Sequence, residues 1–202
     1  MQVTPEDILT FWFADAVEDP VRAMRRRLIW FQVEPAFDET ISRRFAVSLR
    51  RAARGEFAAW EQAPRSCLAL VVLLDQFPRN LYRGRAEAFQ YDSRAIGVAS
   101  RGVAVGYLER LALIEQCVFV LPYEHSEDLS VQRAGVKLVE QIVAGASPEW
   151  EPSARGSLHF AKQHLKIVER FGRFPHRNAA LGRLSTTAEQ AYLEDDTESF
   201  GQ

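Results

Sequence analysis

Two segments of the chain repeat one short pattern of residue types, in which a Phe-Pro pair is closely followed by an Arg-Asn pair. Residues 75–80 read Asp-Gln-Phe-Pro-Arg-Asn, and residues 172–178 read Gly-Arg-Phe-Pro-His-Arg-Asn. Proline cannot continue a helix and pushes the residue before it out of the α region, so each Phe-Pro pair predicts the end of a helix. An arginine at such a turn can hold a carboxylate or a phosphate through two parallel hydrogen bonds. The two segments therefore indicate either a ligand site or a structural clamp.

The first segment offers four side chains for this chemistry. Arg79 and Arg83 could grip an anion while Asp75 orients one of them, and the amide of Asn80 can bond backbone groups. In the alternative interpretation, Asp75 bonds Arg79 or the backbone of the turn and only closes the helix. The residue types alone leave both interpretations open.

A second group of polar residues, His-Ser-Glu-Asp, occupies positions 125–128. Ser126 predicts the N-cap of a helix, and acidic residues at Glu127 and Asp128 favour the helix dipole in its first turn. These roles do not explain His125, which lies just outside that helix. Because histidine titrates near neutral pH, His125 could be a general base or a ligand. The alternative is an imidazole that packs against the helix cap.

A third group surrounds the second Phe-Pro pair and is strongly basic. Its members are Arg170, Arg173, His176, Arg177, Asn178 and Arg183. Arginines this close in sequence repel one another unless carboxylates or a bound anion lie among them. If Asp75, Glu127 and Asp128 are the partners, the result is an internal Arg–carboxylate network. The other interpretation is a pocket for a carboxylate or a phosphate.

These charges lead to one expectation about the tertiary structure. The acids of the first two groups need partners, and the arginines of the third group need counter-charges, although the groups are far apart in the chain. We therefore expect six residues to meet in space: Asp75, Arg79, His125, Asp128, Arg173 and Arg177.

Composition narrows the classes of function. The chain has 202 residues, of which 47% are hydrophobic, and a net charge of −2, which supplies a core but no bulk positive charge for nucleic acid. Cys67 and Cys117 each lie alone in an apolar run, and His159 and His164 are five positions apart, so no metal-ligand spacing is present. The apolar run over residues 67–74 is too short to span a bilayer, and the start of the chain lacks the pattern of a signal peptide. We expect a cytoplasmic protein without metal or other cofactor and without nucleic-acid or membrane partners.

Nearly every segment has helical periodicity. Thr4, followed by a proline, predicts a helix start, and apolar residues at every fourth position from Phe37 to Leu49 predict one buried stripe. Residues 64–77 predict a helix that is apolar nearly all round and therefore lies in the middle of the domain. Residues 70–74 would also suit a buried strand, but the chain offers no second strand to pair with it.

Helices with short connections and no strands predict an all-α fold. We expect one domain over residues 1–202, with an ordered core over about residues 4–195 and about nine helices stacked in antiparallel pairs. The recurrence of the Phe-Pro pattern favours two related halves, as in a pairwise-stacked α-superhelix.

Several stretches taken together resemble the bacterial Domain of Unknown Function 924 family. They are residues 11–13, Trp30-Phe31 followed by Phe37-Asp38, residues 74–80 with 82–84, Ala88-Phe89 with Asp92, residues 125–128, and residues 170–178 with 181–183 and 185–186. The resemblance covers nearly the whole chain and implies a tetratricopeptide-like all-α superhelix. It brings no established activity, substrate or cofactor. Ala14 departs from the glycine usual after Phe-Trp-Phe in the family, which affects the first connection between helices rather than the fold.

The leading interpretation of function is a soluble binding protein with a pocket for an anion, which would be a carboxylate, a phosphate or a peptide end. The pocket would form where residues 75–80, 125–128 and 173–178 converge. Arginine recognises all three kinds of anion through the same bidentate geometry, so the sequence does not choose among them.

Two alternatives remain open. One is a metal-independent enzyme in which His125 or His176 is the general base and Arg79 or Arg177 stabilises negative charge. The other is a structural Arg–acid network, with a surface for a protein partner elsewhere. An open cavity lined by Arg79, His125 and Arg177 would favour ligand binding or catalysis, and burial with full pairing to acids would favour the structural network.

Overall fold

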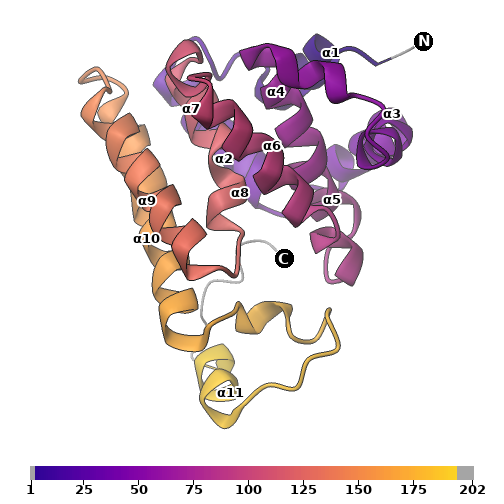
Figure 1. Ribbon diagram of the computed structural model, residues 1–202, viewed down its shortest axis with the longest axis vertical. Helices are drawn as coiled ribbons and strands as arrows, with labels where there is room; N and C mark the ends of the chain where they lie inside the picture. Colours follow the sequence, from indigo (N-terminus) through magenta and orange to yellow (C-terminus); the bar gives the residue numbers. More distant parts are fainter. Residues whose placement is uncertain (1–2, 195–202) are drawn as a thin grey trace.

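The computed structural model describes residues 3–194, and these residues form helices and turns without any β-strand (Figure 1). The all-α prediction is therefore confirmed for this part of the chain. Residue 195, the expected end of the ordered core, lies outside the described residues. Within residues 3–194, no helix combines enough length with enough apolar character to cross a membrane.

The helices follow one another with short connections. The first half contains α1 (Pro5–Phe13), α2 (Pro20–Phe31), α3 (Pro35–Ala53), η1 (Ala58–Gln62), α4 (Pro64–Val71), η2 (Val72–Gln76) and α5 (Phe77–Leu81). The middle contains η3 (Ala86–Phe89), α6 (Asp92–Ala104), η4 (Leu108–Arg110), α7 (Leu113–Phe119) and α8 (Leu121–Glu124). The chain continues through α9 (Leu129–Ala144), α10 (Glu151–Phe171), η5 (Pro175–Arg177) and α11 (Thr187–Glu194). Because α5 continues α4 through η2, and α8 follows α7 after one residue, the described residues form nine helices in space.

Local signals in the sequence explain most helix starts. The hydroxyl group of Thr4 accepts a hydrogen bond from the Asp7 backbone and the Asp7 carboxylate accepts one from the Thr4 backbone, which is a capping box. The Asp19 carboxylate caps α2 by accepting hydrogen bonds from the backbone N–H groups of Val21 and Arg22. A proline occupies the first position of α1, α2, α3 and α4, where its missing N–H group costs nothing.

The helix α4 lies in the middle of the hydrophobic core, as its composition predicts. The apolar residues from Cys67 to Leu74, which span the end of α4 and the start of η2, are at most 2% exposed. Helix α4 packs against α1, α6, α7 and η1. Next to it, the indole rings of Trp12 and Trp30 stack with their centroids 5.3 Å apart. This core fixes the C-terminal end of α4, where the first Phe-Pro segment begins.

The prediction that a helix ends at Phe77-Pro78 is wrong. The helix continues to Leu81, because η2 is a π-helical turn in which the N–H group of Phe77 donates to the carbonyl oxygen of Val72, five residues earlier. A proline ring in a regular α-helix crowds the carbonyl group four residues before it, and the wider turn relieves that crowding. Single π turns of this kind are frequent at functional sites.

The second Phe-Pro pair does follow a helix end. Gly172 adopts the left-handed conformation, with φ of 69°, and stops α10. Phe174 is extended before Pro175, which opens the short η5 turn. Figure 1 shows this C-terminal part as a hook at the lower end of the long antiparallel pair α9 and α10, with α11 at its tip. A small apolar cluster, Ile167, Val168 and Phe174, anchors the hook to α10.

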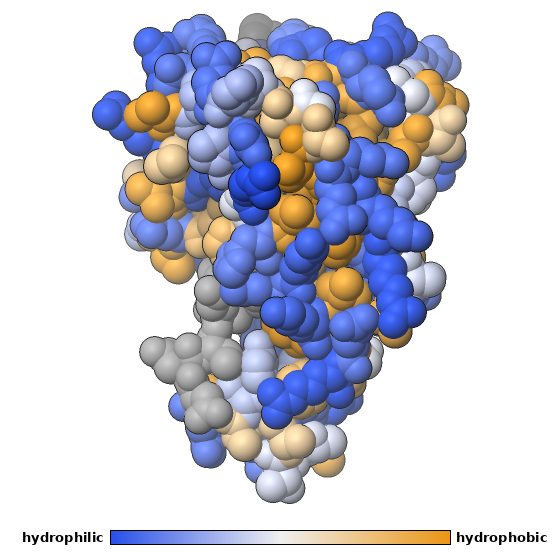
Figure 2. Space-filling view, turned by 90° about the vertical axis from the view of Figure 1, so that its left-hand side faces the viewer, coloured by the Kyte–Doolittle hydropathy of each residue, from blue (hydrophilic) through white to orange (hydrophobic). Residues whose placement is uncertain are grey.

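The outer face of the α9–α10 pair is mostly hydrophilic, with hydrophobic residues visible between the hydrophilic ones, mainly in its upper half (Figure 2). The pair packs closely against α8 at Gly135, where an added Cβ atom would lie 2.7 Å from the Cβ atom of Tyr123. This contact fixes the turn between α8 and α9 that carries His125.

Candidate functional site

Five ionisable side chains from four separate parts of the chain form a continuous series of contacts in the interior. In order of contact they are His125, Asp75, Arg79, Asp92 and Arg177. The four parts are the end of α8, the continuous segment of η2 and α5, the start of α6, and η5. We call this series the charge chain. Four of its members belong to the six residues expected to meet.

The first link joins His125 to Asp75. The Nδ1 atom of His125 lies 2.9 Å from each carboxylate oxygen of Asp75. The side-chain amide of Gln76 donates to the same carboxylate at 2.6 Å. Asp75 is fully buried, whereas the His125 side chain is 13% exposed. Since the contact with Asp75 uses Nδ1, the Nε2 atom of the imidazole is left to contact something else.

In the middle of the charge chain, Arg79 forms three hydrogen bonds with Asp92 and Asp75. The guanidinium group of Arg79 donates to both oxygens of Asp92 at 3.0 Å and to the backbone oxygen of Asp75 at 2.6 Å. Arg79 is 6% exposed. Burial acts to lower its pKa, but the attraction of Asp92 and Asp75 raises it. This arginine is therefore a buried structural cation, as in the structural interpretation of the first segment.

Arg177, at the other end of the charge chain, is buried but only partly hydrogen-bonded. Its Nη1 atom lies 3.3 Å from Asp92, and no other hydrogen bond of the guanidinium group with the described residues is found. The buried Nε atom has no partner. The aromatic rings of Phe89 and Phe174 lie 4.5 Å and 4.4 Å from the centre of the guanidinium group. Burial, with repulsion from Arg79, lowers the pKa of Arg177 to about 10.

In the first link, the surroundings favour an ionised Asp75 and a neutral His125. Burial acts to raise the pKa of Asp75, but the attraction of His125 and Arg79 and the hydrogen bonds from His125 and Gln76 lower it well below its usual range. Burial and Arg79 lower the pKa of His125 against the opposing effect of Asp75. The imidazole is therefore neutral at pH 7, so it gives Asp75 a hydrogen bond, and Arg79 provides the lasting opposite charge.

Further titratable groups surround the charge chain. The ring of His164 lies 6.1 Å from that of His125 and 5.6 Å from that of Phe174, which in turn lies 5.4 Å from that of His176. Burial is the largest cause that lowers the pKa of His164 and of His176, each to about 3. Burial also raises the pKa of Glu124 to about 8, so its carboxyl group is protonated at neutral pH. The site is thus rich in neutral acid–base groups.

Two expected site residues of the first segment lie outside the charge chain. The amide of Asn80 donates to the carboxylate of Asp38 at 2.7 Å, and Arg83 donates to the same carboxylate at 2.9 Å. These contacts tie α5 to α3. Asp38 was part of the family resemblance, but the residue types around it gave no sign of this role.

The remaining expected residues also bond elsewhere. Glu127 accepts two hydrogen bonds from Arg183, at 2.7 Å and 2.9 Å, and one from the backbone of Phe174. Arg173 pairs with Glu189, at 2.6 Å and 2.8 Å. The amide of Asn178 donates to the hydroxyl group of Ser185 at 3.0 Å. These pairs hold the hook together.

Asp128 corrects the expected helix cap. Its carboxylate accepts hydrogen bonds from the backbone of Ser130 and Val131, so Asp128 is the N-cap of α9 and Ser126 lies before the helix. Asp128 and Arg173 therefore do not join the charge chain that was expected to include them. His176 lies close to the charge chain, beside Phe174.

Sequence reasoning missed Asp92 and Phe89 as members of the site. Asp92 bridges the two arginines, and Phe89 lies 5.9 Å from the guanidinium group of Arg79 as well as against Arg177. Both belong to stretches that resemble the family, which is the one signal that could have pointed to them. No local pattern shows that an aspartate at a helix start will face arginines from two other elements.

The described residues contain no group of three or more histidine, cysteine, aspartate or glutamate side chains arranged to hold a metal ion. Two described cavities, of about 520 Å³ and about 380 Å³, lie away from the charge chain. The charge chain offers three kinds of group for chemistry. Arg177 has unsatisfied hydrogen-bond donors, and His125 is a neutral imidazole whose Nε2 atom is not used by Asp75. The charges of the two carboxylates, Asp75 and Asp92, are already balanced by the arginines.

Comparisons with known proteins find similarity over nearly the whole chain. A family model described as "Bacterial protein of unknown function (DUF924)" matches residues 8–197. Among solved structures, that of a protein of unknown function, ATU0120, from Agrobacterium tumefaciens has a TM-score of 0.80 and 36% sequence identity. That match covers 95% of this chain and 97% of the other. No curated protein matches the chain.

Proposed function

The chain belongs to the bacterial family of unknown function DUF924, and on that premise we propose that it binds a small carboxylate through the Nε–Nη2 edge of the Arg177 guanidinium group. The carboxylate oxygens would accept two parallel hydrogen bonds along this edge, which is the geometry in which arginine binds carboxylates most strongly. The ligand would lie at the end of the charge chain, where η5 meets α6.

One observation supports this proposal above all. Arg177 is only 5% exposed, yet its Nε and Nη2 atoms have no hydrogen bond with the described residues. A buried donor without a partner, such as the Nε atom here, costs about 1–3 kcal/mol, and a carboxylate bound along this edge would satisfy it together with Nη2. The rings of Phe89 and Phe174 lie against the centre of the guanidinium group and attract its charge without satisfying its N–H donors, which remain for a ligand.

The structural interpretation accounts for Arg79 but not for Arg177. The donors of Arg79 facing Asp75 and Asp92 are occupied, and the two carboxylates balance the two arginines in charge. If the charge chain served stability alone, the second arginine would be expected to share Asp92 equally, but its one contact there is 3.3 Å long. The difference between the two arginines favours a ligand at Arg177.

A second candidate function is acid–base chemistry on the bound ligand. His125 favours it, because Asp75 contacts Nδ1 with both oxygens and so fixes the orientation of the ring. In the neutral imidazole, Nδ1 then carries the proton and Nε2 carries the lone pair, as in a general base. If the protein is an enzyme of this kind, Arg177 would hold the carboxylate group of the substrate, and His125 would remove a proton from another part of the same substrate.

Calorimetric titration with acetate, succinate and inorganic phosphate tests the binding proposal. We expect the carboxylates to bind the parent protein and Arg177→Gln to weaken that binding at least tenfold, which corresponds to about 1.4 kcal/mol. Arg133→Gln is the matched control, because Arg133 is an exposed arginine that pairs with Glu169 on the adjacent helix. Equal affinities of the parent protein and Arg177→Gln would refute the proposal, and so would a parent protein that binds none of the three anions at 10 mM, on the order of the weakest affinities that matter here.

The same titration separates the two candidate functions. His125→Gln keeps a hydrogen-bond donor near Asp75 but removes the basic nitrogen. If the protein only binds, this variant should retain carboxylate affinity within about threefold, because His125 is not the anion's main partner. If an activity is found, the variant should lose it while it still binds the carboxylate.

A further inference from the structure

A second candidate site lies beside the start of α7, in the larger of the two cavities. Its volume is about 520 Å³, which is within the range of small-molecule sites. It is formed by the turn after α1, by η4 and the start of α7, and by the loop between α9 and α10. None of its lining residues belongs to the charge chain.

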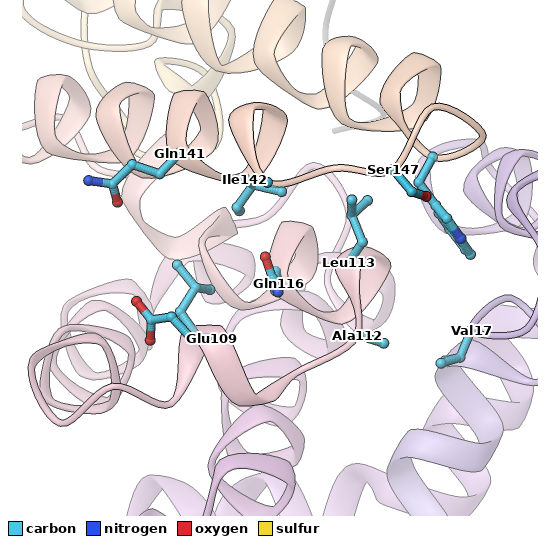
Figure 3. Close-up of a pocket in the computed structure, with 11 residues that line it drawn as sticks. Val17, Glu109, Ala112, Leu113, Gln116, Gln141, Ile142 and Ser147 are labelled. Carbon is cyan, nitrogen blue, oxygen red and sulfur yellow. The ribbon is translucent and has the colours of Figure 1, made fainter.

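The side chains that line the cavity differ in chemistry between its two ends (Figure 3). Glu109 and Gln141 lie at one end, and Val17 and Ser147 lie at the other. Trp150 also lines the cavity, and its backbone N–H group donates to the carbonyl oxygen of Ser147 at 2.9 Å, which keeps it near that second end. Figure 3 shows Gln116, Leu113 and Ile142 between these two ends. One end is therefore polar, and the other presents an aromatic ring and aliphatic side chains.

The polar end and the adjoining middle of the cavity, where Gln116 lies, offer acceptors to a hydrogen-bond donor. The amide nitrogen of Gln116 donates to the backbone oxygen of Leu111 at 2.9 Å, and this bond leaves its carbonyl oxygen as the group available to a ligand. Glu109 is exposed, and its carboxylate forms no ion pair with another described residue. A carboxylate and an amide oxygen both accept hydrogen bonds and both attract positive charge.

The end of α9 adds negative potential to the same cavity. This helix is 16 residues long, and the cavity is lined by Gln141 and Ile142 of its last turn and by Gly145 directly after it. The carbonyl groups at a helix C-terminus carry a partial negative charge that basic residues often balance. The last turn of α9 contains no basic residue.

We propose that this cavity binds an organic ammonium ion with an apolar body. The ammonium group lies between Glu109, the Gln116 carbonyl oxygen and the C-terminal end of α9, and the body packs on Leu113 and Trp150. A primary ammonium group has three donors and no acceptor, which matches a polar end made of acceptors. An ion pair near the surface contributes little binding energy by itself. Burial of the apolar body against the aromatic ring supplies the additional binding energy.

Titration calorimetry with three compounds of similar size tests the proposed charge. Phenethylammonium should bind, while 2-phenylethanol should bind at least threefold more weakly and 3-phenylpropionate should not bind detectably. Equal binding of the carboxylate and the ammonium ion would refute the proposal. So would the absence of phenethylammonium binding at 10 mM, on the order of the weakest useful affinity.

Two variants test the proposed location. Glu109→Gln keeps the size of the side chain and removes its charge, so phenethylammonium affinity should fall about fivefold, which is the upper range for a pair near the surface. Leu113→Trp fills the middle of the cavity and should abolish binding. Glu149→Gln is the control, because Glu149 is an exposed acid in the same loop as Ser147 but does not line the cavity.

The outcomes are decisive even if one variant is unstable. Glu109 is exposed, so Glu109→Gln should melt like the parent protein. Unchanged affinity in Glu109→Gln, or an equal loss in Glu149→Gln, would show that binding does not depend on this end of the cavity and would refute the proposal. The result is independent of carboxylate binding at Arg177, because no residue is shared between the two sites.

Discussion

The two Phe-Pro segments share residue types but differ in backbone, and the difference decides what each arginine can do. In the first, a π turn lets the helix continue through Pro78, so that Arg79 projects from a helix into the core. In the second, Gly172 ends α10 and Arg177 lies in a short turn of the hook. The same short pattern therefore occurs once inside a rigid helix and once in a loop.

The surroundings of the two arginines differ accordingly. The helix presents Arg79 to carboxylates that are fixed on neighbouring elements, and its bonds to Asp92 have good length. The loop presents Arg177 mainly to the rings of Phe89 and Phe174, which attract its positive charge but offer no conventional hydrogen-bond acceptor. A buried arginine can thus be structural or available for a ligand depending on whether acids or rings surround it.

The largest expected effect is the loss of stability when Arg79 is removed. Arg79→Ala leaves Asp75 without its lasting opposite charge and deprives Asp92 of two bonds, so we expect a loss of about 3–5 kcal/mol in the free energy of unfolding. Urea denaturation measures it. Arg133→Ala, which breaks an exposed pair, should cost about 0–1 kcal/mol. A loss of less than 1 kcal/mol in Arg79→Ala would contradict the structural role assigned to Arg79.

The second expected effect is a dependence of protein stability on pH, caused by His176 in the hook. Burial and Arg177, opposed by Glu127, lower the pKa of His176 from 6.5 to about 3. The unfolded chain therefore binds a proton below pH 6.5 that the folded chain does not, so the contribution of His176 to stability is present above pH 6.5 and is lost as pH falls from there toward 3.

The variant His176→Gln isolates this contribution. Between pH 6.5 and pH 5, the stability of the parent protein should fall relative to the variant by on the order of 1 kcal/mol per pH unit. Urea denaturation at several pH values measures the difference, in which effects of other groups such as His164 cancel. The control is His159→Gln, since His159 is exposed on α10. A difference that does not change with pH would show that the hook is not the source of acid sensitivity.

The third expected effect, on stability, is smaller and concerns the end of α10 at Gly172. Only the second Phe-Pro segment follows such a helix end. Gly172 has φ of 69° and no atom within 4 Å of an added Cβ atom, so the cost of Gly172→Ala comes from the backbone alone and should be about 1 kcal/mol. Gly156→Ala, in the interior of the same helix, should instead stabilise the protein by about 0.5–1 kcal/mol. Thermal melting of both variants gives the comparison. If both changes had the same sign, the left-handed cap would not be what ends α10.

The smallest expected effect is on stability when Arg177 is removed. Arg177→Ala breaks one long hydrogen bond and two ring contacts but also removes donors that lack partners, so we expect a change of less than about 1 kcal/mol without ligand. Urea denaturation of this variant beside Arg79→Ala tests the comparison directly. Equal losses for the two arginines would mean that both are structural and that the proposed carboxylate site is wrong.

Much of the fold and part of the candidate site could be predicted from the sequence. The all-α class, the family and the central position of α4 are confirmed. The tetratricopeptide-like arrangement stays a prediction. The expected meeting of Asp75, Arg79, His125 and Arg177 is found, because buried charges must find partners and few were available.

The sequence by itself determined where most helices begin, since capping side chains, prolines and apolar periodicity act within one or two turns of the chain. It did not determine the path at Pro78, because the packing of a fully buried helix outweighed the local preference of proline to stop it. Only the tertiary structure brought Asp92 between the two arginines and left one of them short of hydrogen-bond partners. Such pairings depend on the distances between elements far apart in the chain, and no local preference encodes those distances.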